Sequence, residues 1–134
     1  MALFHCGKSE ISNYGSATQS EQIEWTGSAT TKTGLTHTFS SSEYGKYIVT
    51  GFIQAQQSSS ASIAVMMTCG STGTSADSPM VRNSSGNTVL GASMCAIWDI
   101  DASHNIIALH GYCGASSGTK YVYGGALNWI KVSD

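Results

Sequence analysis

The sequence predicts an all-β domain, a sandwich or barrel of about eight short strands, and three observations support this. Runs rich in β-branched and aromatic residues recur along the chain, several of them alternating with polar residues. Clusters of Gly, Ser, Asn and Thr separate these runs at intervals of about 8–12 residues, a spacing typical of all-β folds. Almost nothing in the chain follows the apolar period of an amphipathic helix. A length of 134 residues suits one domain.

The first half of the chain holds three strand candidates. In residues 22–27, Ile23 and Trp25 share one face of an extended chain, and residues 35–39 alternate in the same way. Residues 45–55 are the strongest candidate, because nearly every position is apolar. That pattern is typical of a central strand covered on both faces.

The second half of the chain supplies the remaining strands, separated by loops rich in Gly and Ser. Residues 101–105 predict a tight turn, because Asp, Ser and Asn side chains hydrogen-bond their own backbone. The final run carries many apolar groups, which indicates a strand inside a sheet. We expect these strands at residues 62–69, 79–82, 88–100 (as one strand or two), 106–113 and 121–132.

The N-terminal region differs from the rest. Residues 1–20 are dominated by Ser, Asn, Gly and Thr and show no apolar period. We therefore expect an irregular N-terminal arm over residues 1–20 and a β domain over residues 21–134. In a free domain such an arm would fray, whereas in an assembly it could lie on a neighbour.

The charge content is low and narrows the possible partners. Charged residues make up 10% of the chain, against about 25% in an average protein, while Ser and Thr number 22 and 13. The net charge is −2, without a cluster of Lys and Arg, so nucleic acid is not an expected partner. No apolar run approaches the roughly 18 residues of a membrane helix. A surface with so few charges favours a protein that packs against copies of itself.

The cysteines and histidines predict neither a metal site nor a cofactor. The four cysteines contain no Cys-x-x-Cys pair and no metal-type spacing with the histidines. We expect free thiols buried as small hydrophobic groups; one or two disulfides in an oxidising compartment are the alternative. The cysteines are Cys6, Cys69, Cys95 and Cys113.

No motif predicts catalysis. Residues 114–118, Gly-Ala-Ser-Ser-Gly, come nearest to the Gly-x-Ser-x-Gly elbow of hydrolases, but they lack its strand-turn-helix context, and Asp and Glu together number only eight. Residues 99–105 place oxygen-bearing side chains at alternate positions, like the start of a calcium loop. However, His104 and His110 stand where such a loop needs Gly and Glu. We expect a hairpin turn there, no catalytic residues and no enzymatic activity.

Four aromatic residues are candidates for a subunit interface. Tyr121, Tyr123 and Trp129 are expected to share one face of the last strand, and Trp98 lies on an earlier strand. Aromatic side chains supply much of the area buried in cores and at interfaces. A platform for stacking sugars is the alternative interpretation.

The order of motifs points to a more specific fold. Residues 43–50, Glu-Tyr-Gly-Lys-Tyr-Ile-Val-Thr, contain a Gly-x-Tyr-x-Val strand, and residues 36–39 form a polar extended segment before it. A hairpin over 97–109 and a closing strand over 126–132 follow. Over residues 35–132 the chain thus resembles the trimeric jelly rolls related to tumour necrosis factor and complement, a type also found in tailed-phage capsid decoration and fibre-tip proteins. The resemblance implies an antiparallel jelly-roll sandwich and a homotrimer.

These observations together favour a viral structural protein. The leading hypothesis is a decoration or cement protein that forms trimers on the capsid of a tailed phage, in the virion, bound to the major capsid protein or another virion protein. One alternative is a receptor-binding tip of a tail or head fibre, which recognises a cell-surface glycan through loops such as 70–78 and 114–119. Another alternative is a cellular carbohydrate-binding module.

Overall fold

The computed structural model describes residues 13–25, 29–30, 34–58, 62–70, 79–83, 89–113 and 118–133. Within these ranges the chain forms ten β-strands and one short 3-10 helix, η1. The elements are β1 (Tyr14–Gln19), β2 (Ile23–Trp25), β3 (Ala29–Thr30), β4 (Thr36–Thr38), η1 (Ser41–Glu43), β5 (Gly45–Gln57), β6 (Ile63–Cys69), β7 (Met80–Asn83), β8 (Val89–Ile100), β9 (Ile106–Cys113) and β10 (Lys120–Ser133).

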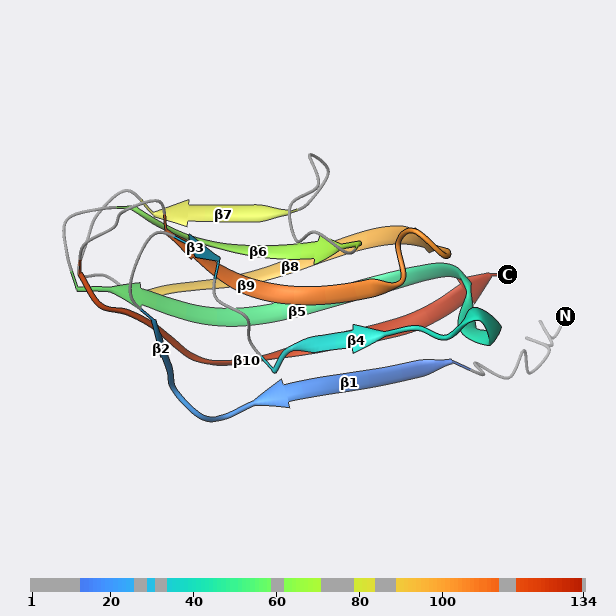
Figure 1. Ribbon diagram of the computed structural model, residues 1–134, viewed down its shortest axis with the longest axis horizontal. Helices are drawn as coiled ribbons and strands as arrows, with labels where there is room; N and C mark the ends of the chain where they lie inside the picture. Colours follow the sequence, from blue (N-terminus) through green and yellow to red (C-terminus); the bar gives the residue numbers. More distant parts are fainter. Residues whose placement is uncertain are drawn as a thin grey trace, which may run out of the picture.

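The strands form two antiparallel five-stranded sheets (Figure 1). Sheet A has the order β1-β10-β5-β8, and β2 also pairs with β10. Sheet B has the order β3-β9-β6-β7, and β4 also pairs with β9. Because β1 and β2 pair with different parts of the same strand, they act as one interrupted strand. The same holds for β3 and β4 along β9.

The pairing is nested in the manner of a jelly roll. The first strands, β1 and β2, pair with the last, β10; β3 and β4 pair with β9; β5 pairs with β8; and β6 pairs with β7. A long hairpin that is rolled up produces this pattern, and the roll closes where β10 meets β5 and β9 meets β6. The predicted antiparallel jelly-roll sandwich of about eight strands is confirmed, with β10 inside its sheet as expected.

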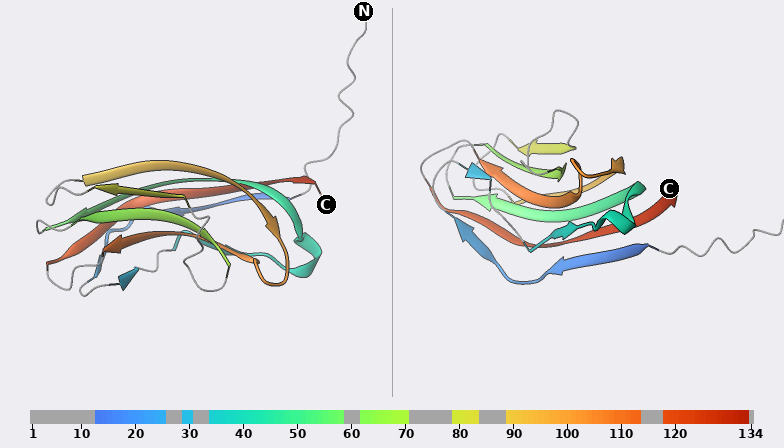
Figure 2. Two further views of the ribbon diagram at one scale, coloured as in Figure 1. Left: turned by 90° about the horizontal axis from the view of Figure 1, so that it is seen from above. Right: turned by 45° about the vertical axis from the view of Figure 1, so that its right-hand side comes forward.

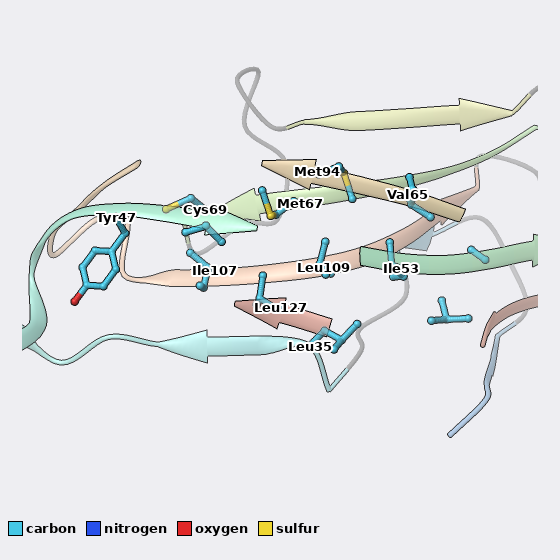
Figure 3. Packing of buried hydrophobic residues seen from close by; sticks show 14 of the residues in the cluster. Leu35, Tyr47, Ile53, Val65, Met67, Cys69, Met94, Ile107, Leu109 and Leu127 are labelled. Carbon is cyan, nitrogen blue, oxygen red and sulfur yellow. The ribbon is translucent and has the colours of Figure 1, made fainter. Parts of the chain in front are cut away.

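The core lies between the two sheets and takes its buried residues from both; Figure 2 shows the sandwich from two further sides. Along β5 every second side chain points inward, so Tyr47, Val49 and Ile53 are buried. Side chains of sheet B, such as Met67 and Leu109, meet them from the opposite layer (Figure 3). The period-2 patterns of the two sheets thus close on one another to form a single core.

One prediction about this core is wrong. Residues 45–55 were expected to be covered on both faces, yet the outward side chains Thr50, Phe52 and Gln54 are exposed. The strand that is covered on both faces is β6, where every residue is buried. The apolar density of β5 therefore fills the core on one side and forms exposed surface on the other.

The N-terminal boundary is also corrected. Residues 14–19, expected to be irregular, form β1 and pair with residues 125–130 of β10. Small Ser, Gly, Ala and Thr side chains hide this strand from an apolar-period search, although exposed and half-buried positions alternate along it. Gly15 is small for a reason: a Cβ atom there would lie 2.4 Å from the Trp129 ring. Residues 1–12 of the expected arm lie outside the described residues.

Candidate functional site

The outer face of sheet A is a surface of exposed and half-buried side chains. The pairing registers align its outward side chains in rows across four strands. We call this surface the uncharged face. Its residues are Tyr14, Ser16 and Thr18 on β1; Gly124, Ala126, Asn128 and Ile130 on β10; Ile48, Thr50, Phe52 and Gln54 on β5; and Gly91, Ser93, Cys95 and Ile97 on β8.

One row of this face is entirely apolar. Tyr14 pairs with Ile130, Ile130 with Ile48, and Ile48 with Ile97. The two ends of the row are the most open, with 75% of Tyr14 and 63% of Ile97 exposed. Phe52, two rows away on β5, is also exposed. Single exposed apolar residues are ordinary, but a contiguous apolar row is typical of an interaction surface.

Charged groups are confined to the margins of the uncharged face. At one end, Lys46 and Asp99 pair across β5 and β8 with 3.5 Å between Nζ and Oδ1. At the other end, Glu24 lies beside Tyr121. Between these margins no described outward side chain carries a charge. A partner can therefore cover this surface without the large desolvation free energy of burying a charge.

Two shallow hollows lie on this face. One is lined by outward residues of β1 and β10, namely Tyr14, Ser16, Asn128 and Ile130, together with Gly15 and Trp129. The other lies across β5 and β8 and is lined by Thr50, Phe52, Ser93 and Cys95, with Gly51, Met94 and Asn128. Neither hollow is lined by Asp, Glu, Lys, Arg or His.

The four aromatic residues predicted from the sequence are divided between the two faces of sheet A. The register of β10 against β5 shifts between Val122 and Gly124, which places a β-bulge at Tyr123. A bulge inserts one residue and reverses the alternation beyond it. The prediction that Tyr121, Tyr123 and Trp129 share one face is therefore wrong: Tyr121 faces outward, whereas Trp129 faces the core.

The two tyrosines form a small aromatic patch beside the uncharged face. The rings of Tyr121 and Tyr123 are stacked with their centroids 6.0 Å apart, and both residues are half-buried. The Tyr123 hydroxyl donates a hydrogen bond to Gln56 Oε1. Gln56 is also the cross-strand partner of Tyr121, so it lies beside both tyrosines.

The two tryptophans pack against the core instead. Trp98 is half-buried and aligned with the buried Tyr47 of β5. Trp129 stacks on His37, with 4.1 Å between ring centroids and 17° between ring planes. Phe39 meets the His37 ring edge-on at 4.6 Å. Both tryptophans thus anchor the sandwich from within, where their large apolar area contributes to folding.

His37 gives this aromatic cluster a pH dependence. Burial lowers the pKa of His37 below its ordinary 6.5, although the nearby charge of Glu43 acts in the opposite direction. The Nε2 atom is buried, and no described residue hydrogen-bonds it. The folded protein therefore favours the neutral ring.

We expect the free energy of unfolding to be highest above about pH 6.5 and to fall as the pH decreases. The reason is that His37 takes up a proton at a higher pH in the unfolded chain than in the folded protein. One proton gives a slope of at most about 1.4 kcal/mol per pH unit, and the loss ends below the folded pKa. Urea unfolding between about pH 7.5 and 5.5 measures it. His37→Gln should flatten the profile. An unchanged slope in His37→Gln contradicts the assignment.

The remaining candidate groups show structural roles. Cys69 and Cys113 are buried thiols, as expected, and burial raises the pKa of the Cys69 thiol to about 11. Cys95 is free but exposed, which corrects the prediction for that residue; Cys6 lies outside the described residues.

At the β8–β9 turn, Asp101 Oδ1 accepts hydrogen bonds from the backbone amides of Ser103 and His104, each 2.8 Å long. These bonds form the predicted hairpin turn and lower the pKa of Asp101.

The described residues contain neither a metal-binding cluster nor a membrane-spanning helix. No group of three His, Cys, Asp or Glu side chains lies close enough together to hold a metal ion. No helix in that part of the chain is long and apolar enough to cross a membrane. Most of the two loops suggested for glycan recognition, 70–78 and 114–119, lies outside the described ranges.

Comparison with known proteins adds information about the fold. No protein-family model and no curated protein matches this chain. A chain in the structure of infectious bursal disease virus, Gx strain, is similar, with a TM-score of 0.56 and 14% sequence identity. The match covers 89% of this chain and 32% of that chain, so this chain spans about a third of the other's length. At this level of identity the similarity concerns the fold alone, an all-β sandwich consistent with a jelly roll.

Proposed function

We propose that this protein is a non-enzymatic structural subunit of a virion, and specifically a capsid decoration protein that forms trimers on the shell of a tailed phage. The uncharged face carries the proposal. It combines an exposed apolar row with polar but uncharged neighbours, and its rigid sheet is already ordered. A protein built this way can dock on a neighbour at little cost in conformational entropy.

The size of the uncharged face is sufficient for such a contact. Four strands spaced about 4.8 Å apart and four rows spaced about 6.8 Å apart cover roughly 500 Å² of projected area. A contact that covers this face on one partner and an equal area on the other removes about 1,000 Å² of protein surface from water, which is the lower limit for a specific interface. The similarity in fold to a chain in a virus structure supports a virion as the setting.

Location and shell binding test the proposal. In purified phage particles we expect the protein in hundreds of copies, and we expect the isolated protein to bind emptied shells and raise their resistance to heat. The measurements are quantitative mass spectrometry of the particle, co-sedimentation with shells, and shell calorimetry with and without added protein. A few dozen copies or fewer, or failure to bind shells, would contradict a decoration role.

A second candidate is glycan recognition by a fibre tip or a cellular carbohydrate-binding module. The stacked pair of Tyr121 and Tyr123 favours it, since such rings can stack against a sugar and Gln56 accepts a hydrogen bond from the Tyr123 hydroxyl. Both rings are half-buried, however, which leaves little of each for a ligand. Binding of the isolated protein to a glycan array would favour this candidate over the first.

A further inference from the structure

The edges of the two sheets differ in a way that singles out β8. This strand forms one edge of sheet A and runs without interruption for 12 residues. Among the described residues, its backbone is paired only with β5. The other edges are shorter: β7 has four residues, and β1 and β2 divide the opposite edge of sheet A between them. In the left view of Figure 2, β8 is the gold strand along the upper margin.

The features that normally prevent an edge strand from pairing are missing from β8. Natural edges are protected by shortness, proline, lysine or a bulge. The strand contains no proline, lysine or arginine, and its single charge, Asp99, lies next to its end. Its register with β5 continues through 12 successive pairs without a shift, so no bulge bends it away. Such an edge presents a full row of backbone donors and acceptors to another strand.

We propose that two copies of this chain pair through β8, antiparallel and about a twofold axis, so that their A sheets join into one. A second copy fits because antiparallel self-pairing brings no like charges together: the two Asp99 carboxylates lie toward opposite ends of the paired strands. Residues 89–98 of both copies carry no charge. The β8 strand of a second copy thus matches this edge in length, charge and hydrogen-bonding pattern.

Symmetry restricts the register. Directly opposed residues of antiparallel strands point to the same side of a sheet, so the residue at a twofold axis pairs with its own copy. For a strand over 89–100, the two registers of greatest overlap place either Met94 or Cys95 at the axis. In the second register, two Cys95 Cα atoms would lie about 4.5–5.5 Å apart, close enough for a disulfide. In the first, Cys95 lies opposite Ser93 of the second copy.

This pairing uses the backbone edge of β8 and is independent of the proposed role in a virion. If both hold, a twofold contact between trimers would link them into a net over a shell. Shell binding can fail while the pairing persists, and the pairing can fail while shell binding persists, so the two proposals are tested separately.

Hydrogen exchange of the full chain tests the pairing. A Cys6→Ser variant should form dimers as its concentration rises to about 1 mM, as measured by sedimentation. Backbone amides at alternate positions of β8, those directed to the free edge, should then exchange more slowly by a factor of about ten or more. A monomer throughout this range, or a dimer whose β8 amides exchange as fast as in the monomer, overturns the proposal.

Cross-linking distinguishes edge pairing from contact through the uncharged face. In the Cys6→Ser background, mild oxidation should link the chains through Cys95, or through the added cysteine of Ser93→Cys if Met94 lies at the axis. The matched control is Thr50→Cys with Cys95→Ser, which moves the thiol one strand inward along the same row. Its two thiols would be about 14 Å apart in an edge-paired dimer. Equal cross-linking by the control indicates face-to-face contact and overturns the proposal.

Discussion

Gly125→Ala is expected to lower the free energy of unfolding by about 3 kcal/mol or more. A Cβ atom at this position would lie 2.3 Å from the backbone oxygen of Phe52 and 2.8 Å from Leu35 Cδ1. Gly125 pairs with Ile53, whose Cα would be 3.2 Å away, in the middle of the ladder between β10 and β5. Backbone atoms of a central ladder cannot move aside without lengthening hydrogen bonds on both sides, so the clash persists.

Gly91→Ala is the matched control for this prediction. The same Cβ atom placed at Gly91 would meet nothing nearer than Gln54 Cγ at 3.6 Å, which is ordinary contact. Since alanine also restricts the unfolded chain, the change in the free energy of unfolding should lie within about 1 kcal/mol and favour folding. Urea unfolding followed by tryptophan fluorescence measures both variants. Equal stability of the two would show that sheet A accommodates a side chain at Gly125.

Sequence patterns predicted most of the fold because the core strands carry strong local signals. Residues 45–55, 62–69, 88–100, 106–113 and 121–132 each correspond to one long strand. Their β-branched and aromatic residues are needed to fill the space between the sheets. The nested pairing that defines the jelly roll came instead from the order of motifs, since strand pairing is a contact between distant segments.

The strands that escaped prediction are those that bury little. β1 contributes Gly15 and Ala17 to its inward face, and β3 consists of two residues. An edge strand of this kind is held by backbone hydrogen bonds to β10 or β9, which any sequence can form. Alternation of apolar and polar residues therefore carries no information about it.

The candidate site escaped prediction for a different reason. Its apolar row combines Tyr14, Ile48, Ile97 and Ile130, which are separated along the chain and aligned only by register. The bulge at Tyr123 then moved Trp129 to the opposite face from Tyr121. The sequence signal for this face was the apolar density on both sides of residues 45–55. An outer face that is exposed and one that is covered give the same apolar pattern, so the sequence does not distinguish them.

Lysine substitution on the uncharged face should abolish shell binding while the protein stays folded. Tyr14→Lys and Phe52→Lys change two exposed apolar residues, with 75% and 41% of their surface open, on β1 and β5. Neither lies on β8, so strand pairing through that edge is unaffected. Because a docked partner would bury both ammonium groups without a counter-ion, the double variant should bind shells about 100-fold more weakly or worse, a loss of about 3 kcal/mol.

The control places the same added charge on the other sheet. Thr38→Lys and Met80→Lys alter exposed residues of β4 and β7 in sheet B, outside the uncharged face. This variant should bind shells as the native protein does, because its lysines stay in water. Both variants should unfold within a few degrees of the native protein, since exposed substitutions usually change stability by about 0.5 kcal/mol or less. Comparable loss of binding in both would indicate a general charge effect, and full binding by the Tyr14→Lys and Phe52→Lys variant would exclude the uncharged face as the docking surface.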